Sequence, residues 1–306
     1  MATGAPEAQP SPAIVFETLN SYQRTAALNT AIELDLFTAI ADGGATAGAV
    51  ATRTQSAERG VRTLCDYLTI LGLLRKNGGE YSLTPDSAAF LNRRSPTYLG
   101  SITKFLLSDY NQDNFRRLTA AVREGGAPAD RSSVQPNNAI WVDFARSMAP
   151  MMAFPAEMIA KIVAETGRPP VKVLDIAAGH GLFGLAIARH NPGAEITALD
   201  WAAVLEVAKE NAARAGVSAR YRTIPGSAFD ADFGEGYDLV LLTNFLHHFD
   251  AATCETLLRK VHAALKPDGR VVTLEFVPNE DRVSPPVPAA FSMIMLTATP
   301  GGDAYT

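Results

Sequence analysis

Two adjacent histidines, His247 and His248, closely follow an apolar run that ends at Thr243. An imidazole accepts protons near neutral pH, so a histidine at the end of a buried strand is a candidate general base. Glu275 is the one charged residue in a second apolar run, Val271–Val277, and a buried carboxylate needs a partner. A carboxylate that accepts from one imidazole nitrogen orients the ring and raises its basicity. These residues are candidates for a general base and its carboxylate partner; the alternative is that the histidines are structural, which is the more common role of an isolated histidine.

A second motif, Asp175–Gly181, carries a short apolar run into a glycine turn just before a helical stretch. Such a turn lets the backbone approach a ligand closely. We do not predict a dinucleotide pattern GxGxxG here, because only Gly179 and Gly181 stand in useful places. Asp200 ends the next apolar run, where an acid can accept hydrogen bonds from both hydroxyls of a ribose. The alternative role for Asp200 is that of a helix N-cap.

Five apolar runs alternate with helical stretches after residue 167, which predicts a parallel, doubly wound sheet. The predicted strands are Val171–Ile176, Glu195–Leu199, Ala219–Ile224, Tyr237–Thr243 and Arg270–Val277. The predicted helices are Leu182–Arg189, Ala202–Ala215 and Ala252–Leu265. Ligands of such sheets bind at the carboxyl ends of the strands, which is where the glycine turn, Asp200 and the two histidines fall.

The first part of the chain predicts a winged helix over residues 13–92, after a disordered tail at 1–12. Its pattern is a helical region from Ala13, a helix at Ala47–Arg53, a helix capped by Ser56 that runs to Gly72, a hairpin around Asn77–Gly79 and a helix that begins at Thr84-Pro85. Residues 93–166 predict a helical linker that roofs the substrate pocket. This linker starts at Ser95-Pro96 and breaks at Gly125–Asn138.

A winged helix raises the alternative of a ligand-sensing DNA-binding protein. Arg53, Arg59 and Arg62 surround the second helix, but specific DNA binders carry a denser basic face. The net charge of −5 also gives no general attraction to nucleic acid or anionic membranes. We therefore interpret the domain as a dimerisation module, in which the apolar helical region Ile14–Phe37 packs against a partner chain.

The chain has 306 residues, 47% of them hydrophobic, which suffices for a large core. The two cysteines, Cys65 and Cys254, form no metal-binding or disulfide pattern. The N-terminus lacks the features of a signal peptide, and no apolar run is long enough to span a bilayer. We expect a cytoplasmic protein. His180, His190 and His262 look incidental, and the absence of a carboxylate-rich set predicts no magnesium or zinc.

Several motifs together resemble those of the class I methyltransferases. They are Asp175–Gly181, Asp200, Gly226-Ser227-Ala228-Phe229 and Lys266-Pro267-Asp268-Gly269-Arg270. With the winged helix in front, the chain from Ile14 onward resembles the caffeic acid/acetylserotonin-type small-molecule O-methyltransferases, including bacterial natural-product enzymes. The resemblance implies an α/β fold with a Rossmann-like class I methyltransferase sheet over residues 167–306. It also implies S-adenosyl-L-methionine as cofactor, a small hydroxyl acceptor and a homodimer formed through the N-terminal domain.

The resemblance also assigns roles to residues. It makes His247 the base and Glu275 its partner, and it leaves His248 to packing. The cofactor-binding residues it implies are Asp175, Ala177, Gly179, Gly181, Asp200, Trp201, Gly226, Ser227, Ala228, Phe229, Thr243 and Asn244. The substrate-pocket residues it implies are Phe105, Met148, Met152, Phe291, Met295 and Thr299. Such an apolar pocket suits a flat aromatic or polyketide-like acceptor.

The sequence departs from the family in three places. Ala177-Ala178 replace glycines, Ser227 replaces a frequent Asp, and Ala304 stands where plant members have a second glutamate. Two alternatives keep the fold and cofactor: N- or C-methylation, and hydroxylation or decarboxylation. Family members also continue past Thr306 with a helix and two antiparallel strands. We therefore expect a chain that is incomplete at its C-terminus and, as it stands, poorly soluble or weakly active.

Overall fold

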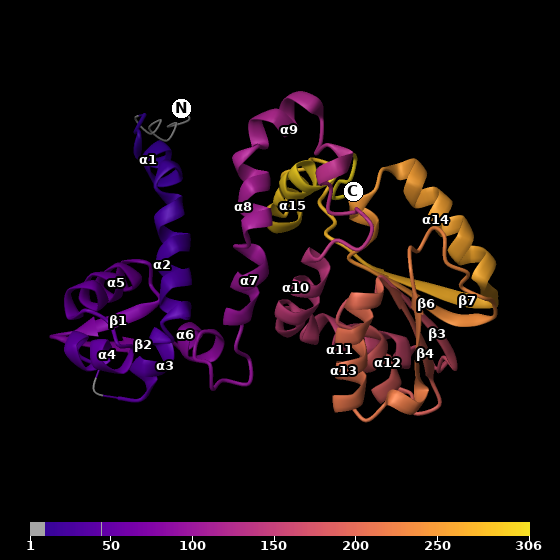
Figure 1. The fold of residues 1–306 in the computed structure, drawn as a ribbon, viewed down its shortest axis with the longest axis horizontal. Coiled ribbons are helices and arrows are strands. Elements are labelled where there is room, and N and C mark those ends of the chain that lie inside the picture. Colours follow the sequence, from indigo (N-terminus) through magenta and orange to yellow (C-terminus); the bar gives the residue numbers. More distant parts are fainter. Residues whose placement is uncertain (1–9, 44) are drawn as a thin grey trace, which may run out of the picture. The chain divides into compact units, whose positions relative to one another are not determined.

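The structure is a computed structural model that describes residues 10–43 and 45–306, so most of the expected disordered tail lies outside the described residues. The chain divides after Gly100 into two compact units, and the second runs from Ser101 to Thr306 (Figure 1). Each unit has its own hydrophobic core.

The N-terminal unit contains the helix–helix–hairpin pattern that the sequence predicts. Its elements are α1 (Ala13–Leu19), α2 (Ser21–Glu33), α3 (Leu36–Ala41), α4 (Ala47–Arg53), α5 (Glu58–Ile70), β1 (Leu74–Asn77), β2 (Glu80–Leu83) and α6 (Pro85–Phe90). Strands β1 and β2 pair antiparallel as the wing. Leu36, Phe37, Val50, Cys65 and Leu68 are fully buried between these elements. The winged-helix prediction is confirmed.

Two predicted helix caps in this unit had different outcomes. Thr84 caps α6 as predicted, because its Oγ1 accepts from the backbone N–H of Ser87 at 3.3 Å. Ser56 does not cap α5: its hydroxyl donates to the carbonyl of Thr54 at 3.0 Å, and Ala57 takes the N-cap position without a side-chain bond. The prediction at Ser56 was wrong because a nearer carbonyl competes for the hydroxyl.

The predicted helix start at Ser95-Pro96 was also wrong. Residues 91–97 form turns and bends, and the backbone N–H of Leu99 reaches back to the carbonyl of Phe90 at 2.8 Å. That bond folds the chain onto the end of α6, which does not allow a helix to begin there. The next α-helix begins at Thr103.

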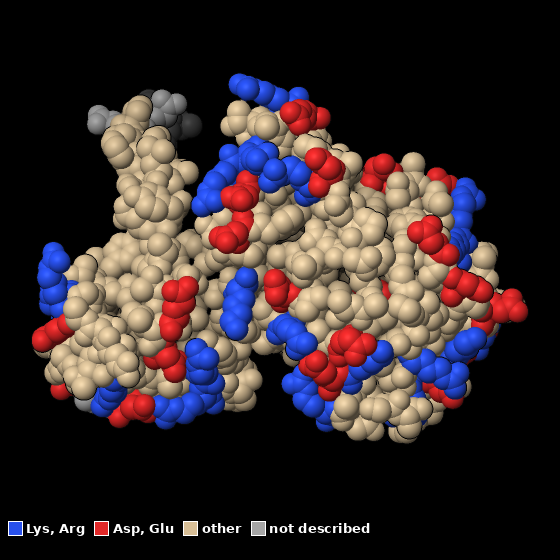
Figure 2. Space-filling view, in the orientation of Figure 1, with Lys and Arg blue, Asp and Glu red and all other residues tan. Residues whose placement is uncertain are grey.

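An apolar face of α1 and the start of α2 is open to solvent in the single chain. Ile14, Val15, Phe16, Leu19 and Tyr22 are each at least 55% exposed. On the side of the molecule shown in Figure 2, this stretch displays no charged side chain. A hollow of about 510 Å³ lies in the same unit, lined by residues of α2, of α5 and of the segments that flank them. Apolar exposure of this extent is typical of a surface that another chain covers.

The second unit is built on a parallel five-stranded sheet in the order β5-β4-β3-β6-β7. The strands are β3 (Lys172–Ile176), β4 (Glu195–Asp200), β5 (Tyr221–Pro225), β6 (Tyr237–Thr243) and β7 (Leu265–Leu274). The helices α11 (Ala149–Glu165), α12 (Leu182–His190) and α13 (Ala202–Arg214) cover one face, and α14 (Ala251–Ala264) covers the other (Figure 1). The predicted Rossmann-like α/β fold is confirmed.

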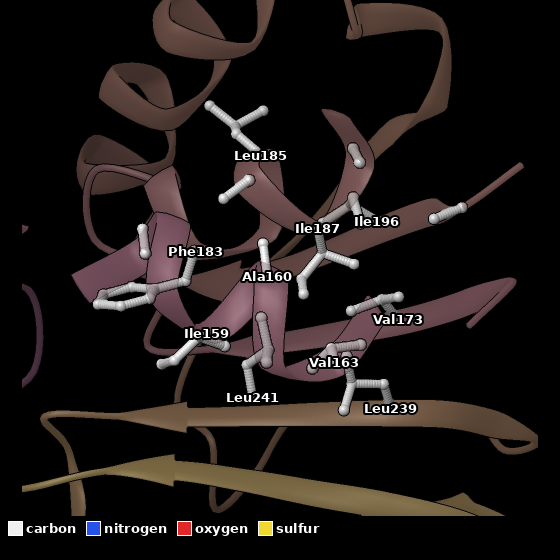
Figure 3. Close-up of a cluster of buried hydrophobic side chains, with 14 of the residues drawn as sticks. Ile159, Ala160, Val163, Val173, Phe183, Leu185, Ile187, Ile196, Leu239 and Leu241 are labelled. Atoms are coloured by element: carbon white, nitrogen blue, oxygen red, sulfur yellow. The ribbon is translucent and has the colours of Figure 1, made fainter. Parts of the chain in front are cut away.

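The central strands are buried on both faces, which explains why most of their residues are apolar. Leu239 and Leu241 point into the cluster formed with α11 and α12 (Figure 3), while Val240 and Leu242 point toward α14. This alternation fixes the register of β6 in the middle of the sheet, because a shift by one residue would exchange the two sets.

The fifth strand differs from its prediction. It covers Leu265–Leu274 rather than Arg270–Val277, and its pairing with β6 is irregular between Tyr237 and Leu239. Its last ladder bond runs from the N–H of Asn244 to the carbonyl of Leu274 at 2.7 Å. The strand ends there because Glu275 turns toward residues 245–247.

A helical layer connects to this sheet. Its elements are α7 (Thr103–Leu106), α8 (Asp109–Arg116), α9 (Leu118–Glu124), α10 (Ile140–Ser147) and α15 (Pro286–Ala298). The predicted break at 125–138 is confirmed, and it packs on the end of α15 through Ala127 N–H to Thr299 O and Ser133 N–H to Ala298 O, both 2.8 Å. Across the described ranges, no helix has the length and apolar character needed to cross a bilayer.

Candidate active site

His247 and Glu275 form a hydrogen-bonded pair. His247 lies in the short 3₁₀ turn Leu246–His248 after β6, and Glu275 directly follows β7. The distance from His247 Nδ1 to Glu275 Oε2 is 2.5 Å, and only 4% of His247 is exposed. A carboxylate can only accept from Nδ1, so the proton of the neutral ring stays there and Nε2 keeps a free lone pair.

Glu275 is itself held in place. Its other oxygen, Oε1, accepts from the backbone N–H groups of Phe245 and Leu246 at 2.9 and 2.8 Å. The carboxylate therefore fixes the imidazole ring and the turn that carries it at the same time. A histidine with one nitrogen held by a fixed acid and one free is arranged for general base chemistry.

Aromatic rings surround His247. The Phe291 ring of α15 meets it edge-on with centroids 4.8 Å apart, and Phe276 stacks on Phe291 at 4.0 Å and 13°. The ring of His248 lies 4.3 Å away on another side. His248 is buried, and burial, reinforced by the neighbouring His247, lowers its pKa well below the ordinary value, so it stays neutral. Its edge-on contact with Trp141 at 5.1 Å fits the predicted packing role.

The glycine turn between β3 and α12 is shaped by three left-handed residues. Ala177, Gly179 and Gly181 have φ angles of 54°, 56° and 75°. A Cβ added at Gly181 would lie 2.5 Å from the hydroxyl of Tyr221, so this position is closed by packing. A Cβ added at Gly179 would meet nothing nearer than 3.9 Å. Gly179 therefore presents open backbone, to which a ligand can come close.

The prediction that the turn lacks a third useful glycine was wrong. Gly184 completes the spacing Gly179-x-Gly181-x-x-Gly184, and it lies inside α12. A Cβ there would come within 2.8 Å of Ile196 Cγ2 and 2.9 Å of Asp175 Oδ2. This glycine allows α12 to pack closely on the sheet, which is the role that the third glycine of GxGxxG has elsewhere. The signal for this glycine was present in the sequence, three residues after Gly181.

Asp175 lies under this helix, away from the surface. It is fully buried, and its Oδ2 accepts from the Gly184 N–H at 3.0 Å. Burial raises the pKa of Asp175 to about 7. The Asp175 carboxyl group thus stabilises the start of α12 from the sheet side. Because no atom of its side chain is exposed, Asp175 has no surface with which to make the cofactor contact that the family resemblance implies.

Asp200 holds the glycine turn. Its Oδ2 accepts from the Gly179 N–H at 2.8 Å and its Oδ1 from the Trp201 N–H at 2.7 Å. Burial raises the pKa of Asp200 to about 6. Each carboxylate oxygen can accept a second bond, so Asp200 can still serve the ribose hydroxyls implied for it. The indole of Trp201 packs with residues of α10 and α13.

His180, which the sequence marked as incidental, has a local function. Its Nδ1 accepts from the backbone N–H of Leu182 at 3.2 Å, and one of the free N–H groups at the start of α12 is thereby satisfied. Burial lowers the pKa of His180 to about 4. The proton of this neutral ring then sits on Nε2, which is buried and has no partner among the described residues.

The turn after β5 contains the other residues implied at the cofactor. Gly226 donates to the carbonyl of Asp200 at 2.9 Å, and the hydroxyl of Ser227 accepts from the Phe229 N–H at 3.1 Å. Ala228 and Phe229 belong to the core on the α14 side, where the Phe229 ring meets Phe249 edge-on at 5.0 Å. The short Ser227 side chain therefore stabilises the turn through this hydrogen bond.

The remaining predicted residues lie at the end of β6 and in the helical layer that connects to the sheet. Thr243 is the buried last residue of β6, and Asn244 next to it has its Nδ2 3.6 Å from Met152 Sδ. Phe105 meets Phe144 edge-on at 5.1 Å. Met148, Met295 and Thr299 are buried. The hydroxyl of Thr299 donates to the Met295 carbonyl and accepts from the Gly302 N–H. The Thr299 hydroxyl is committed to these bonds.

Sequence reasoning missed several aromatic residues of this region, namely Trp141, Phe144 and Phe276. Trp141 and Phe144 lie three residues apart on α10, so both can face the same way. Phe144 also stacks with His180 at 6.3 Å. That spacing in the sequence was the available signal. Within the described part of the chain, no group of three or more His, Cys, Asp or Glu side chains could hold a metal ion.

Comparison with known proteins agrees with this architecture. A family model described as an O-methyltransferase domain matches residues 142–305, and one described as an O-methyltransferase dimerisation domain matches residues 16–93. The chain belongs to the O-methyltransferase family. The methyl donor of this family is S-adenosylmethionine, and the solved relative PigF, 25% identical, was crystallised with S-adenosylhomocysteine, which confirms the cofactor predicted from the sequence.

Individual relatives of this O-methyltransferase cover almost all of it. A 3-hydroxy-5-methyl-1-naphthoate 3-O-methyltransferase from Streptomyces sahachiroi is 29% identical over 99% of this chain and 88% of its own length. The crystal structure of an O-methyltransferase candidate from Nostoc punctiforme is 55% identical with a TM-score of 0.95, over 97% of this chain and 90% of that one. Human N-acetylserotonin methyltransferase, solved with S-adenosylmethionine, shares the fold at 23% identity and a TM-score of 0.82, over 100% and 90% of the two chains.

Proposed function

We propose that this O-methyltransferase transfers a methyl group to a hydroxyl of a small aromatic or polyketide-like metabolite, with His247 as general base. The observation that carries the proposal is the His247–Glu275 pair, with Nδ1 and Oε2 2.5 Å apart at the carboxyl end of the sheet. Ligands of parallel sheets bind at that edge.

The residues around the glycine turn fit S-adenosylmethionine. Gly179 offers an open stretch of backbone that a larger side chain would fill, and Asp200 has acceptor capacity left beside it. The turn after β5, with Ser227 and Phe229, is the implied adenine side, and Thr243 and Asn244 the implied methionine side. When bound, the cofactor supplies a sulfonium that makes its methyl group electrophilic.

In this proposal His247 removes the proton from the acceptor hydroxyl. A phenol or alcohol is mostly protonated at neutral pH, so removal of its proton makes the oxygen a better nucleophile. The free Nε2 of His247 takes that proton, and the Glu275 carboxylate stabilises the imidazolium that results. The aromatic rings beside His247 exclude water and hold the acceptor in line.

The walls of the site favour a flat aromatic acceptor. Phe291 and Phe276 form a stacked pair next to His247, and aromatic rings prefer such stacked or edge-on neighbours. The Streptomyces relative is named for a hydroxynaphthoate, which has this shape. We expect hydroxylated naphthoates and related polyketide-type phenols to be better acceptors than aliphatic alcohols.

We further propose a homodimer formed through the N-terminal unit. The dimerisation-domain match covers α2 to α6, and the apolar side chains exposed on α1 and α2 in the single chain would be buried by a second copy. Isologous pairing of such a face is the common arrangement in soluble homo-oligomers.

The experiment is methyl transfer from isotope-labelled S-adenosylmethionine to a panel of hydroxynaphthoates, simple phenols and matched aromatic amines. We expect labelled aryl methyl ethers, identified by mass spectrometry, and little product with His247→Ala. Transfer to amines alone, or transfer that His247→Ala leaves unchanged, would contradict O-methylation by this base.

A further inference from the structure

One lysine of the catalytic unit is bonded to the main chain of the turn after β5. Lys260 lies on α14, and its Nζ donates to the carbonyls of Ala228, Phe229 and Ala231 at 3.0, 2.8 and 2.7 Å. Its Nζ also lies 4.3 Å from the centre of the Phe233 ring. Three carbonyls of one turn thus converge on a single ammonium group.

The bonding of this ammonium is complete. A protonated lysine has three donors, and all three are used by the turn. Burial lowers the pKa of Lys260, and the nearby Asp230 and Asp232 partly counteract that shift. Lys260 therefore has no donor left for a ligand, and any effect it has on a ligand is exerted through the turn.

The turn depends on this cation for much of its shape. Its first residue, Gly226, is held by the bond from its N–H to the carbonyl of Asp200 at 2.9 Å, and within the turn the Ser227 carbonyl accepts from the N–H groups of Asp230 and Ala231 at 3.2 and 2.9 Å. Lys260 is thus the link that ties the carbonyls of residues 228–231 to a helix. Among the described residues, no other donor contacts those three carbonyl oxygens.

We propose that Lys260 is a positioning residue for the cofactor, which holds the turn Gly226–Phe233 in the shape that receives the adenosine part of S-adenosylmethionine. This inference rests on the proposed function, because it takes Ser227, Ala228 and Phe229 as the adenine side of the site. Loss of the ammonium leaves three carbonyls without their donor, so the turn becomes mobile and the cofactor must order it on binding.

Arg220 offers a matched control. Its guanidinium also donates to three backbone carbonyls, those of Ala188, Asn191 and Ala194, at 3.2, 3.4 and 2.6 Å. These carbonyls lie in the last turn of α12 and in the connection to β4, whereas the glycine turn lies at the beginning of α12. A variant at Arg220 therefore removes a comparable cation from the same unit without touching the proposed site.

The test compares Lys260→Met, Lys260→Arg and Arg220→Met with the unsubstituted 306-residue chain. The first readout is the affinity for S-adenosylhomocysteine by calorimetry, and the second is hydrogen exchange of the amides of residues 226–233. We expect Lys260→Met to bind roughly tenfold more weakly and to exchange faster in this turn. Lys260→Arg keeps the charge and should recover most of the affinity. In turnover, the KM for S-adenosylmethionine should rise while kcat changes little.

Arg220→Met should lose thermal stability and keep its affinity. Equal affinity in Lys260→Met and wild type would overturn the inference while leaving the proposed function intact. Equal weakening in Arg220→Met would overturn it too, since the effect would then be general destabilisation. A wild type that binds no S-adenosylhomocysteine would refute the cofactor site itself. Should Lys260→Met fail to fold, Lys260→Gln, which keeps two donor hydrogens, serves for the same comparison.

Discussion

Glu275 accepts from His247 through one carboxylate oxygen and from the backbone of Phe245 and Leu246 through the other. A single side chain therefore sets the position of the imidazole, its tautomer and the fold of the turn that carries it. The negative charge of Glu275 and the direction of its hydrogen bond to His247 have different effects on the imidazole, and substitutions at Glu275 can distinguish them.

Glu275→Gln should preserve the orientation of the His247 ring but change which of its nitrogens carries the proton. The amide keeps the size of the side chain and can still accept from the two backbone N–H groups, but its NH₂ group would donate to Nδ1. The proton of His247 would then move to Nε2, which could no longer accept from a hydroxyl. We expect kcat to fall by about 10²–10⁴, as for loss of a general base, with unchanged affinity for S-adenosylhomocysteine. Steady-state kinetics with calorimetry would check this, and a near-normal kcat would contradict the assignment.

His247→Ala should have the same kinetic effect, with a fall in kcat of about 10²–10⁴ and the cofactor still bound. His248→Ala is the control, because that ring is neutral, buried and packed against Trp141. It should lower stability more than the chemical step. If the phenotypes of the two variants were exchanged, His248 would be the base.

Gly179 and Gly184 should respond differently to substitution. Gly179→Val places a branched side chain at a φ of 56° on the open face of the turn, so it should abolish cofactor binding. Gly184→Ala places a methyl group 2.8 Å from Ile196 and should cost about 1–3 kcal/mol of unfolding free energy through overpacking. Urea unfolding and calorimetry on both proteins would test this. A stabilised Gly184→Ala variant would mean that α12 can shift to make room.

The buried Asp175 predicts a pH dependence of stability. Its pKa is raised by burial from 3.8 to about 7 in the folded state, so the unfolded chain releases this proton at lower pH than the folded chain does. Stability contributed by this site is therefore greatest below pH 3.8 and is lost as the pH rises toward 7, by at most about 1.4 kcal/mol per pH unit. Asp175→Asn cannot ionise, so it should gain stability relative to wild type over that range. Urea unfolding of both proteins from about pH 5 to about pH 8, a range that includes the pKa of about 7, would test this. A difference in unfolding free energy between Asp175→Asn and wild type that does not change with pH would contradict the prediction.

The apolar face of α1 predicts the oligomeric state. Leu19→Glu places a charge on a residue that is 66% exposed in the single chain, and it should shift a dimer toward monomer. Val283→Glu, at a residue that is 73% exposed in the catalytic unit, is the matched control and should leave the assembly unchanged. Sedimentation velocity of the three proteins would decide between these outcomes. A monomeric wild type would count against the dimer.

Local patterns in the sequence were enough for the architecture. Largely apolar runs such as Tyr237–Thr243 predicted buried parallel strands, because a strand covered on both faces has apolar residues on both sides. The hairpin of β1 and β2 and the Thr84 cap followed from turn and capping chemistry within a few residues. The pairing of His247 with Glu275 could also be anticipated, since a charge in an apolar run needs a partner and both residues stand at strand ends.

Only the tertiary structure decided how the polar groups are shared. Ser56 lost its capping role to a competing carbonyl, Asp175 was placed beneath Gly184, and Lys260 was brought to three carbonyls some thirty residues earlier in the chain. Periodicity reports which face of an element is buried, but a hydrogen bond depends on which atoms of distant segments come within about 3 Å. That distance is set by the packing of whole helices on the sheet, and no spacing within the sequence encodes it.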